Sequence, residues 1–297
     1  MLINADNLRT LRTALNAAFN GGFNEQAAGI DDYWAFTEDV ISPTGDEEYG
    51  WLDDIQMPRK WEGDRFIANV RQNAYRLIEE PYERTIGVKR RHIETDRYGL
   101  YAKRFQLMGK AARRHPASMM FDQLLNGFSR TCFDGQYFFD TDHPVAGGVV
   151  SNMQAGAGAA WFLLDTRNFI KPLILQRAFR EYIFESKEDA NQSDHVFNRD
   201  EFLYGIRNYL VPGYGFWQLA FGSKAALDAT NFGGAYNALM GMTNDNGEKL
   251  GVTPSLLVVG PGNREPALNV VKRERDTNGA SNINYQAVDV LVTPWLP

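Results

Sequence analysis

Residues 98–128, YGLYAKRFQLMGKAARRHPASMMFDQLLNGF, carry the pattern that decides the fold. Apolar residues recur along this stretch at helical spacing, and lysines and arginines lie between them. One helix of this length would span roughly 45 Å, which predicts a beam rather than a core-filling helix. Pro116 predicts a kink or a second helix start, because proline lacks the backbone donor, and Asn126-Gly127 predicts the end. The apolar positions are Tyr101, Phe105, Met108, Ala112, Met120, Leu124 and Phe128.

Composition limits the class of protein. The chain of 297 residues is long enough for two modest domains or for one elaborated domain, and 44% hydrophobic residues can form a packed core. A net charge of −6 argues against a nucleic-acid binder that works by bulk electrostatics. The single cysteine, Cys132, excludes an internal disulfide and fits a reducing compartment. The first ten residues lack the pattern of a secretory signal, and no apolar run could span a membrane, so we expect a soluble protein made in the cytoplasm.

Two neighbouring segments have opposite charge. Residues 25–54 contain ten acids and no lysine or arginine, together with five aromatic residues that an acidic disordered tail would lack. Residues 84–114 contain ten cations and two acids, a net charge of +8. We expect the acidic segment to dock on the basic one, within a subunit or between neighbours. The alternative is that both are solvated faces.

The remaining elements follow from local patterns. Residues 4–19 predict a helix capped by Asn4 or Asn7 and ended by Gly21-Gly22, and residues 23–56 predict an irregular segment. Residues 74–79 and 82–88 predict a hairpin, with Pro81 favouring an edge strand. Further strands are predicted at 161–164, 169–175, 202–210, 215–221, 256–259 and 288–292, with a turn at Val211-Pro212-Gly213, and helices beginning at Thr230 and Pro261.

The chain offers little that suggests catalysis. Asp140, Asp142 and His143 resemble metal ligands, but a site would need a further ligand, and the same residues form good turns. Cys132 is interpreted as a buried structural thiol. No nucleophile elbow, phosphate-binding loop or dinucleotide fingerprint is present. The sequence therefore predicts no catalytic, cofactor-binding or metal-binding residues and a protein that is not an enzyme.

Motifs along almost the entire chain resemble one family. They are YGWL at Tyr49, KWEGDR at Lys60, YERTIGVKRRHIETDRYGLY at Tyr82, HPASMMFDQLLNGF at His115, CFDGQYFFDTDHP, WFLLDTRNFIKPLILQ, GFWQLAFGS, LLVVGPGNREPAL and VDVLVTPWL. Each motif is weak alone, but together and in this order they are similar to the Mu-type phage major head subunit (T protein) family.

That resemblance implies an α+β fold, the HK97-type phage capsid fold, with an N-terminal arm, an extended β-ribbon loop, a long spine helix, and peripheral and axial domains. On this chain it implies the following parts: arm, 1–48; extended loop, 49–83; spine helix and start of the peripheral domain, 84–134; connecting loop, 135–160; peripheral strands, 161–224; axial domain, 225–297.

The implied function is a major capsid protein that self-assembles, as hexamers and pentamers, into the icosahedral shell around the genome of a tailed phage or Mu-like prophage. The implied partners are a separate scaffolding protein, a maturation protease, a portal at one vertex and, weakly, the packaged double-stranded DNA, with no membrane. The implied location is the virion, after assembly in the host cytoplasm.

The residues expected at subunit interfaces are Trp34, Trp51, Trp61, Arg65, Arg113 and Arg114. For the tryptophans, ordinary packing within the chain is the alternative. An encapsulin-like nanocompartment shell, a metal-dependent enzyme and a nucleic-acid-binding module built on the basic segment are the rival functions.

Overall fold

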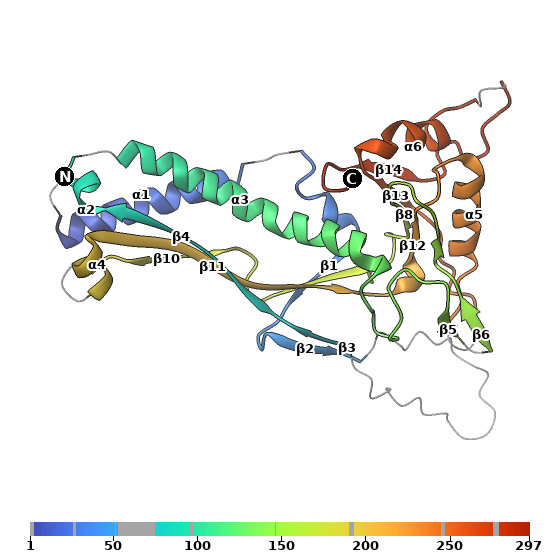
Figure 1. The fold of residues 1–297 in the computed structure, drawn as a ribbon, viewed down its shortest axis with the longest axis horizontal. Coiled ribbons are helices and arrows are strands. Elements are labelled where there is room, and N and C mark those ends of the chain that lie inside the picture. The colour runs from blue at the N-terminus through green and yellow to red at the C-terminus, as the bar shows by residue number, and fades with distance from the viewer. Residues whose placement is uncertain are drawn as a thin grey trace, which may run out of the picture.

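The computed structural model describes residues 3–25, 28–50, 52, 75–95, 98–145, 147–189, 193–244, 247–275 and 279–297. The molecule is elongated, and the long helix α3 (Tyr98–Leu125) runs from one end toward a second, more compact part (Figure 1). One sheet follows this helix along the elongated part, and another sheet forms the compact part. None of the described helices combines the length and the apolar character that a membrane span needs.

Helix α3 confirms the long helix that was predicted from the apolar spacing. It runs for 28 residues and ends in a 3₁₀ turn at Asn126–Phe128. The helix continues through Pro116, so neither a restart nor a break occurs there. The predicted apolar stripe is buried from Tyr101 to Leu124, which explains why packing outweighs the one lost backbone hydrogen bond.

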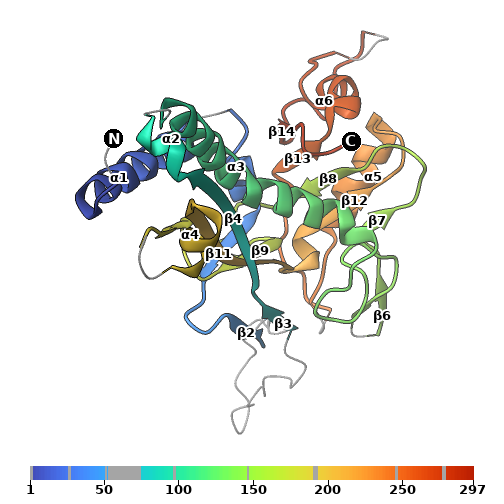
Figure 2. The same cartoon turned by 60° about the vertical axis from the view of Figure 1, so that its left-hand side comes forward.

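Helix α1 (Ala5–Phe23) lies alongside α3 (Figure 2). Asn4 caps it, since its side chain accepts a hydrogen bond from the amide of Asn7 at 2.8 Å. The predicted end at Gly21-Gly22 is wrong. A Cβ at Gly22 would lie 1.9 Å from the carbonyl oxygen of Gln106, so this glycine permits close contact between two helix backbones rather than a stop.

The first sheet has the order β1-β9-β11-β10, and β4 pairs with β11 as well. Strand β1 is parallel to β9, and the other pairs are antiparallel. The predicted turn at Val211-Pro212-Gly213 is wrong, because Pro212 lies in the ladder opposite Leu175 and β11 continues through it. The strands are β1 (Thr37–Ile41), β4 (Glu80–Lys89), β9 (Leu173–Arg177), β10 (Ile183–Lys187) and β11 (Glu201–Tyr214). The short helices α2 (Arg90–Glu94) and α4 (Asp194–Arg199) lie at the end of this sheet that is away from the compact part.

The predicted hairpin of residues 74–79 and 82–88 is also wrong. Strand β3 (Tyr75–Ile78) pairs with β2 (Asp46–Tyr49) in a separate ribbon, whereas β4 turns away to pair with β11. Within the described part of the chain β4 has a neighbour on one side only, which suits Pro81. Strands β1 and β2 and a 3₁₀ turn at Asp32–Ala35 likewise correct the prediction that residues 23–56 are irregular.

The second sheet has the order β14-β13-β8-β12-β7. Two of its strands, β8 and β12, come from the segment 161–224, which therefore divides between the two sheets. Helix α5 is capped by Asp228 rather than by Thr230. The elements are β7 (Met153–Gln154), β8 (Trp161–Leu164), β12 (Ala220–Ser223), β13 (Leu256–Val259), β14 (Asp289–Val292), α5 (Ala229–Met240) and α6 (Arg264–Val271), beside the small hairpin β5 (His143–Val145) and β6 (Gly148–Val150) and 3₁₀ turns at Trp217–Leu219 and Pro261–Asn263.

Buried apolar residues form two clusters. The distal cluster joins α1, the first half of α3 as far as Ala112, β4 and the start of β11. The proximal cluster begins on α3 at Ala117 and continues through β9 and the end of β11 into the second sheet, α5 and α6. Among the described elements, helix α3 and strand β11 contribute buried residues to both clusters.

Candidate assembly surfaces and a buried group of ligand-like side chains

The acidic segment docks on α3 within one subunit. The Nζ of Lys110 lies 2.8 Å from a carboxylate oxygen of Glu25, and Nη2 of Arg113 donates to both oxygens of Asp31 at 2.7 and 2.6 Å. Both ion pairs are substantially exposed, so each contributes little to folding on its own. The expected docking of acidic on basic segment is therefore present inside the chain at these residues.

A more buried contact fixes the next part of the same segment. The guanidinium of Arg177 binds Asp39 through two hydrogen bonds, of 2.6 and 2.7 Å, and its side chain is only 9% exposed. It also lies over the ring of Trp34, 5.2 Å from the ring centre. Trp34 and Arg113 line an open cavity of about 330 Å³ between this segment, α3 and the first sheet. This arrangement joins residues 34–39 firmly to the sheet.

Three of the six predicted interface residues, Trp34, Arg113 and Arg114, lie in the described part of the chain. Trp34 is half-buried and packs against Tyr33, with ring centres 4.4 Å apart, and against Arg177. Arg113 is held by Asp31, whereas Arg114 is exposed and has no ion pair among the described residues. Trp51, Trp61 and Arg65 lie outside the described residues. The interface role of all six stays a prediction.

One face of α3 has exposed leucines that the sequence analysis missed. Leu100 is 68% exposed and Leu107 is 66% exposed, and their spacing of seven places them on the same side of the helix. Lys103, Arg104 and Arg114 lie on this exposed side too and make no salt bridge within the described chain. The sequence signal that could have revealed this face is that Leu100 and Leu107 lie outside the predicted apolar stripe of the helix.

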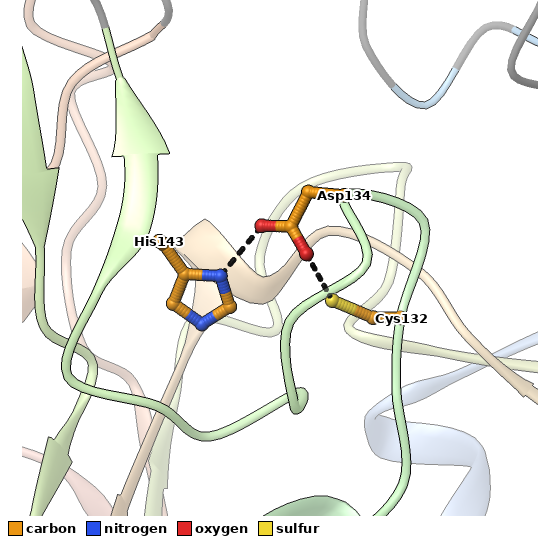
Figure 3. A group of neighbouring side chains, drawn as sticks. All are labelled: Cys132, Asp134 and His143. Carbon is orange, nitrogen blue, oxygen red and sulfur yellow. Dashed lines mark hydrogen bonds and ion pairs between the residues drawn. The ribbon is translucent and has the colours of Figure 1, made fainter.

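The structure supports the turn interpretation of Asp140 and does not place Asp140 and Asp142 with His143 as a group of ligands. Asp140 accepts hydrogen bonds from the amides of Thr141 at 2.7 Å and Tyr137 at 3.3 Å, as its alternative role in a turn requires, and Asp142 is exposed. His143 is instead fully buried beside Asp134, with Nδ1 2.6 Å from Oδ2. The thiol of Cys132 donates to the other oxygen of Asp134 at 3.0 Å (Figure 3).

The electrostatics of this group follow from its burial. Burial raises the pKa of the Cys132 thiol, and the neighbouring carboxylate of Asp134 raises it further. For Asp134 burial acts in the same upward direction, but hydrogen bonds from His143 and Cys132 outweigh it and hold the pKa below its usual value. A protonated, buried thiol is a poor nucleophile. The group therefore offers hydrogen bonding and ligand atoms rather than covalent catalysis.

Comparisons with known proteins agree along the whole chain. The model of the family described as Mu-like prophage major head subunit gpT matches residues 8–296. The major capsid protein of Escherichia phage Mu is 31% identical over 298 residues, covering 96% of this chain and 96% of that protein.

Solved structures give the same result. A chain of the procapsid of bacteriophage JBD30 is 37% identical, with a TM-score of 0.82, over 99% of this chain and 100% of that one. A chain of the JBD30 capsid decorated with minor capsid protein trimers is 31% identical, with a TM-score of 0.78, over 92% of each.

These findings confirm the expected α+β capsid fold of the HK97 type. They also favour a phage head protein over the nanocompartment and enzyme alternatives, since the matching family and relatives are structural head proteins. The chain belongs to the Mu-like prophage major head subunit gpT family and is a major capsid protein of the Mu-like phage type.

Proposed function

We propose that copies of this chain self-assemble, as hexamers and pentamers, into a closed icosahedral shell that encloses the double-stranded DNA genome of a tailed phage or Mu-like prophage. The observation that carries the proposal is the similarity over 99% of the chain to a subunit of a procapsid. A shell of identical subunits needs heterologous contacts, in which different surfaces of neighbouring copies meet.

Within the subunit, we assign α1, α3 and the first sheet to the peripheral domain and the second sheet with α5 and α6 to the axial domain. The pairing of β8 and β12 with one another and of β8 with β13 supports this division. It revises the sequence-based division in two ways. There, α1 belonged to the arm of residues 1–48, and residues 161–224 and 225–297 formed two separate parts. The β2–β3 ribbon pairs the end of the arm, 1–48, with a strand of the extended loop, 49–83.

The contacts between subunits involve the arm, the extended loop and the exposed face of α3. Trp34, Trp51, Trp61 and Arg65 are the proposed anchors of the arm and loop. Arg114 is the proposed interface cation of α3, because it is exposed and makes no ion pair in the described chain. Arg113 has a second role, since it already binds Asp31 within the subunit.

Other components take part in assembly. A scaffolding protein and a maturation protease act on a precursor shell in the host cytoplasm, a portal occupies one vertex, and packaged DNA touches the inner surface weakly and without sequence preference. The similarity to a procapsid chain supports a precursor stage.

Electron microscopy of the purified chain at high concentration tests self-assembly directly. Closed shells, alone or with co-expressed scaffolding protein, are expected. The double variant Arg113→Glu/Arg114→Glu is expected to stay folded and to block shell formation. The single variant Arg114→Glu distinguishes an effect on the subunit interface from an effect on the ion pair within the chain, because it leaves the contact between Arg113 and Asp31 intact. Normal particles from the double variant would contradict the proposed role of both residues, and a chain that stays monomeric under all these conditions would contradict shell formation.

A further inference from the structure

Three side chains of different chemistry converge beneath the second sheet. One ligand atom each from Cys132, Asp134 and His143 lies within 4.8 Å of the other two (Figure 3). His143 is 0% exposed, and Cys132 is 6% exposed. A thiolate, a carboxylate and an imidazole are the three ligand types that zinc prefers in proteins.

The chain turns tightly to bring two of these ligands together. Gly135 has φ of +87°, a conformation that glycine adopts without strain, and its amide donates to the carbonyl of Cys132 at 3.1 Å. The amide of Cys132 in turn donates to Gln136 at 2.8 Å. Two residues that are separated by one position therefore both face His143.

The imidazole of His143 is held in one orientation. Its ring stacks on Trp217, with centres 3.9 Å apart and planes 10° apart. Nε2 lies 3.2 Å from Oδ1 of Asn152, and the Nδ2 of that amide donates to the carbonyl of Phe138 at 2.7 Å, so the oxygen must face the ring. Nε2 consequently carries a proton, and Nδ1 is the atom that faces Asp134.

A positive species is required between Nδ1 and Asp134. Two acceptors, Oδ1 of Asn152 and Oδ2 of Asp134, flank the ring, and a neutral imidazole can donate to only one of them. Either a second proton lies on Nδ1, or a metal ion binds there. A histidine whose far nitrogen donates to a fixed oxygen is the usual arrangement for a metal ligand.

We propose that Cys132 Sγ, an oxygen of Asp134 and Nδ1 of His143 bind one thiophilic divalent metal ion of the zinc class, with water in the fourth position. The ion enters with two positive charges, and two protons leave, one from Sγ and one from Nδ1, so the buried group is electrically neutral before and after binding.

The geometry needs little change to admit the ion. Tetrahedral zinc with bonds of about 2.0 Å to nitrogen and oxygen separates those two atoms by about 3.3 Å. The present distance from Nδ1 to Oδ2 is 2.6 Å, so the group opens slightly on binding. The bound ion would join the loop of residues 131–137 to the start of β5, next to Trp217 and the second sheet.

The test uses the purified full-length chain and two probe metals. After equilibration with Zn²⁺ and removal of free metal by gel filtration, one zinc per chain is expected by elemental analysis. With Co²⁺, a near-ultraviolet thiolate-to-cobalt band and strong visible bands of tetrahedral cobalt are expected. Cys132→Ser preserves a hydroxyl donor to Asp134 and removes the thiolate, so it should lose the near-ultraviolet band and weaken binding more than about 100-fold.

Two further variants separate binding from folding. Asp142→Asn changes an exposed neighbouring carboxylate and should bind like the wild type. His143→Gln should lose binding, and circular dichroism of each variant verifies the fold. Zinc should raise the midpoint of thermal unfolding of the wild type and leave that of Cys132→Ser unchanged. Wild-type chain that retains no metal, or cobalt spectra that are identical in wild type and Cys132→Ser, would overturn the proposal and leave His143 as a hydrogen-bond partner of Asp134.

Discussion

The distal and proximal clusters stabilise the two ends of one subunit in different ways. The distal cluster packs α1 and α3 against one face of the first sheet, and the two helix backbones approach closely at Gly22 and Gly109, where a Cβ would meet the other helix. The proximal cluster packs large side chains, Trp161 and Trp217 among them, around buried polar groups such as Asn152. The distal end therefore contains a helix–helix contact that glycines permit, and the proximal end is filled by large side chains around buried polar groups.

Removing a large side chain from the proximal cluster should have the largest effect. Trp161→Ala is expected to lower the free energy of unfolding by about 4 kcal/mol. Trp161 is fully buried, and its indole nitrogen donates to the carbonyl of Ala225 at 2.9 Å, which the variant would leave without this donor. Urea unfolding of the unassembled chain measures the loss. Phe169→Ala is the control, since Phe169 is 90% exposed, and a loss below about 1 kcal/mol for Trp161→Ala would contradict the contrast.

The next largest difference is expected between two of the ion pairs that connect the acidic segment to the rest of the subunit, Asp39 with Arg177 and Asp31 with Arg113. Arg177→Ala is expected to cost about 3 kcal/mol, because it leaves Asp39 without its partly buried partner and removes the contact with Trp34. Arg113→Ala should cost less than about 1 kcal/mol, because its pair with Asp31 is exposed. Equal losses in chemical denaturation would show that burial does not distinguish the two contacts.

The close approach of α1 and α3 can be tested with adjacent glycines. Gly22→Ala should cost about 2 kcal/mol, since the added Cβ meets the backbone of Gln106. Gly21→Ala has open space and should leave stability unchanged or raise it by about 0.5 kcal/mol, because alanine favours a helix. The midpoints of thermal unfolding of the two variants and of the wild type measure this difference. Similar behaviour of the two would refute the explanation given for the extension of α1 beyond Gly21.

The smallest expected effect concerns pH. Burial raises the pKa of Glu38, on β1, above its ordinary range, although a hydrogen bond from the amide of Lys171 opposes this. The contribution of such a carboxyl to stability is full below its unfolded pKa and is lost as the pH rises through the folded pKa. Glu38→Gln should therefore lose less stability than the wild type between acidic and neutral pH, by under about 1 kcal/mol given its partial exposure. Glu48→Gln, at an exposed position, is the matched control, and identical pH profiles of wild type and Glu38→Gln would contradict the expectation.

Local signals predicted local structure well. The apolar spacing of residues 98–128 gave the correct helix, and Asn4 gave the correct cap, because both depend on neighbours within a turn or two. Pro116 suggested a break in the helix and Gly22 suggested a helix end, and both predictions failed for the same reason. Proline can also lie inside a packed helix, and glycine can also permit a close contact between backbones, and only the packing partner shows which of these applies.

Pairing between distant segments could not be predicted. Thr37 pairs with Leu173 and Leu257 pairs with Leu163, and nothing near these residues in the sequence specifies the partner. The ligand-like group shows the same limit. Asp142 is adjacent to His143 in sequence and points elsewhere, whereas Asp134 reaches the imidazole because the turn at Gly135 brings it back.

Pro116 lies where the two clusters meet, between Ala112 of the distal cluster and Ala117 of the proximal one. Since proline supplies no amide hydrogen, the helix lacks one rung of its hydrogen-bond ladder at this point. The helix is therefore expected to bend more easily at the junction than at a position with a complete hydrogen-bond ladder. Subunits at differently curved positions of one container can then differ by a small angle about this residue while each cluster keeps its own packing.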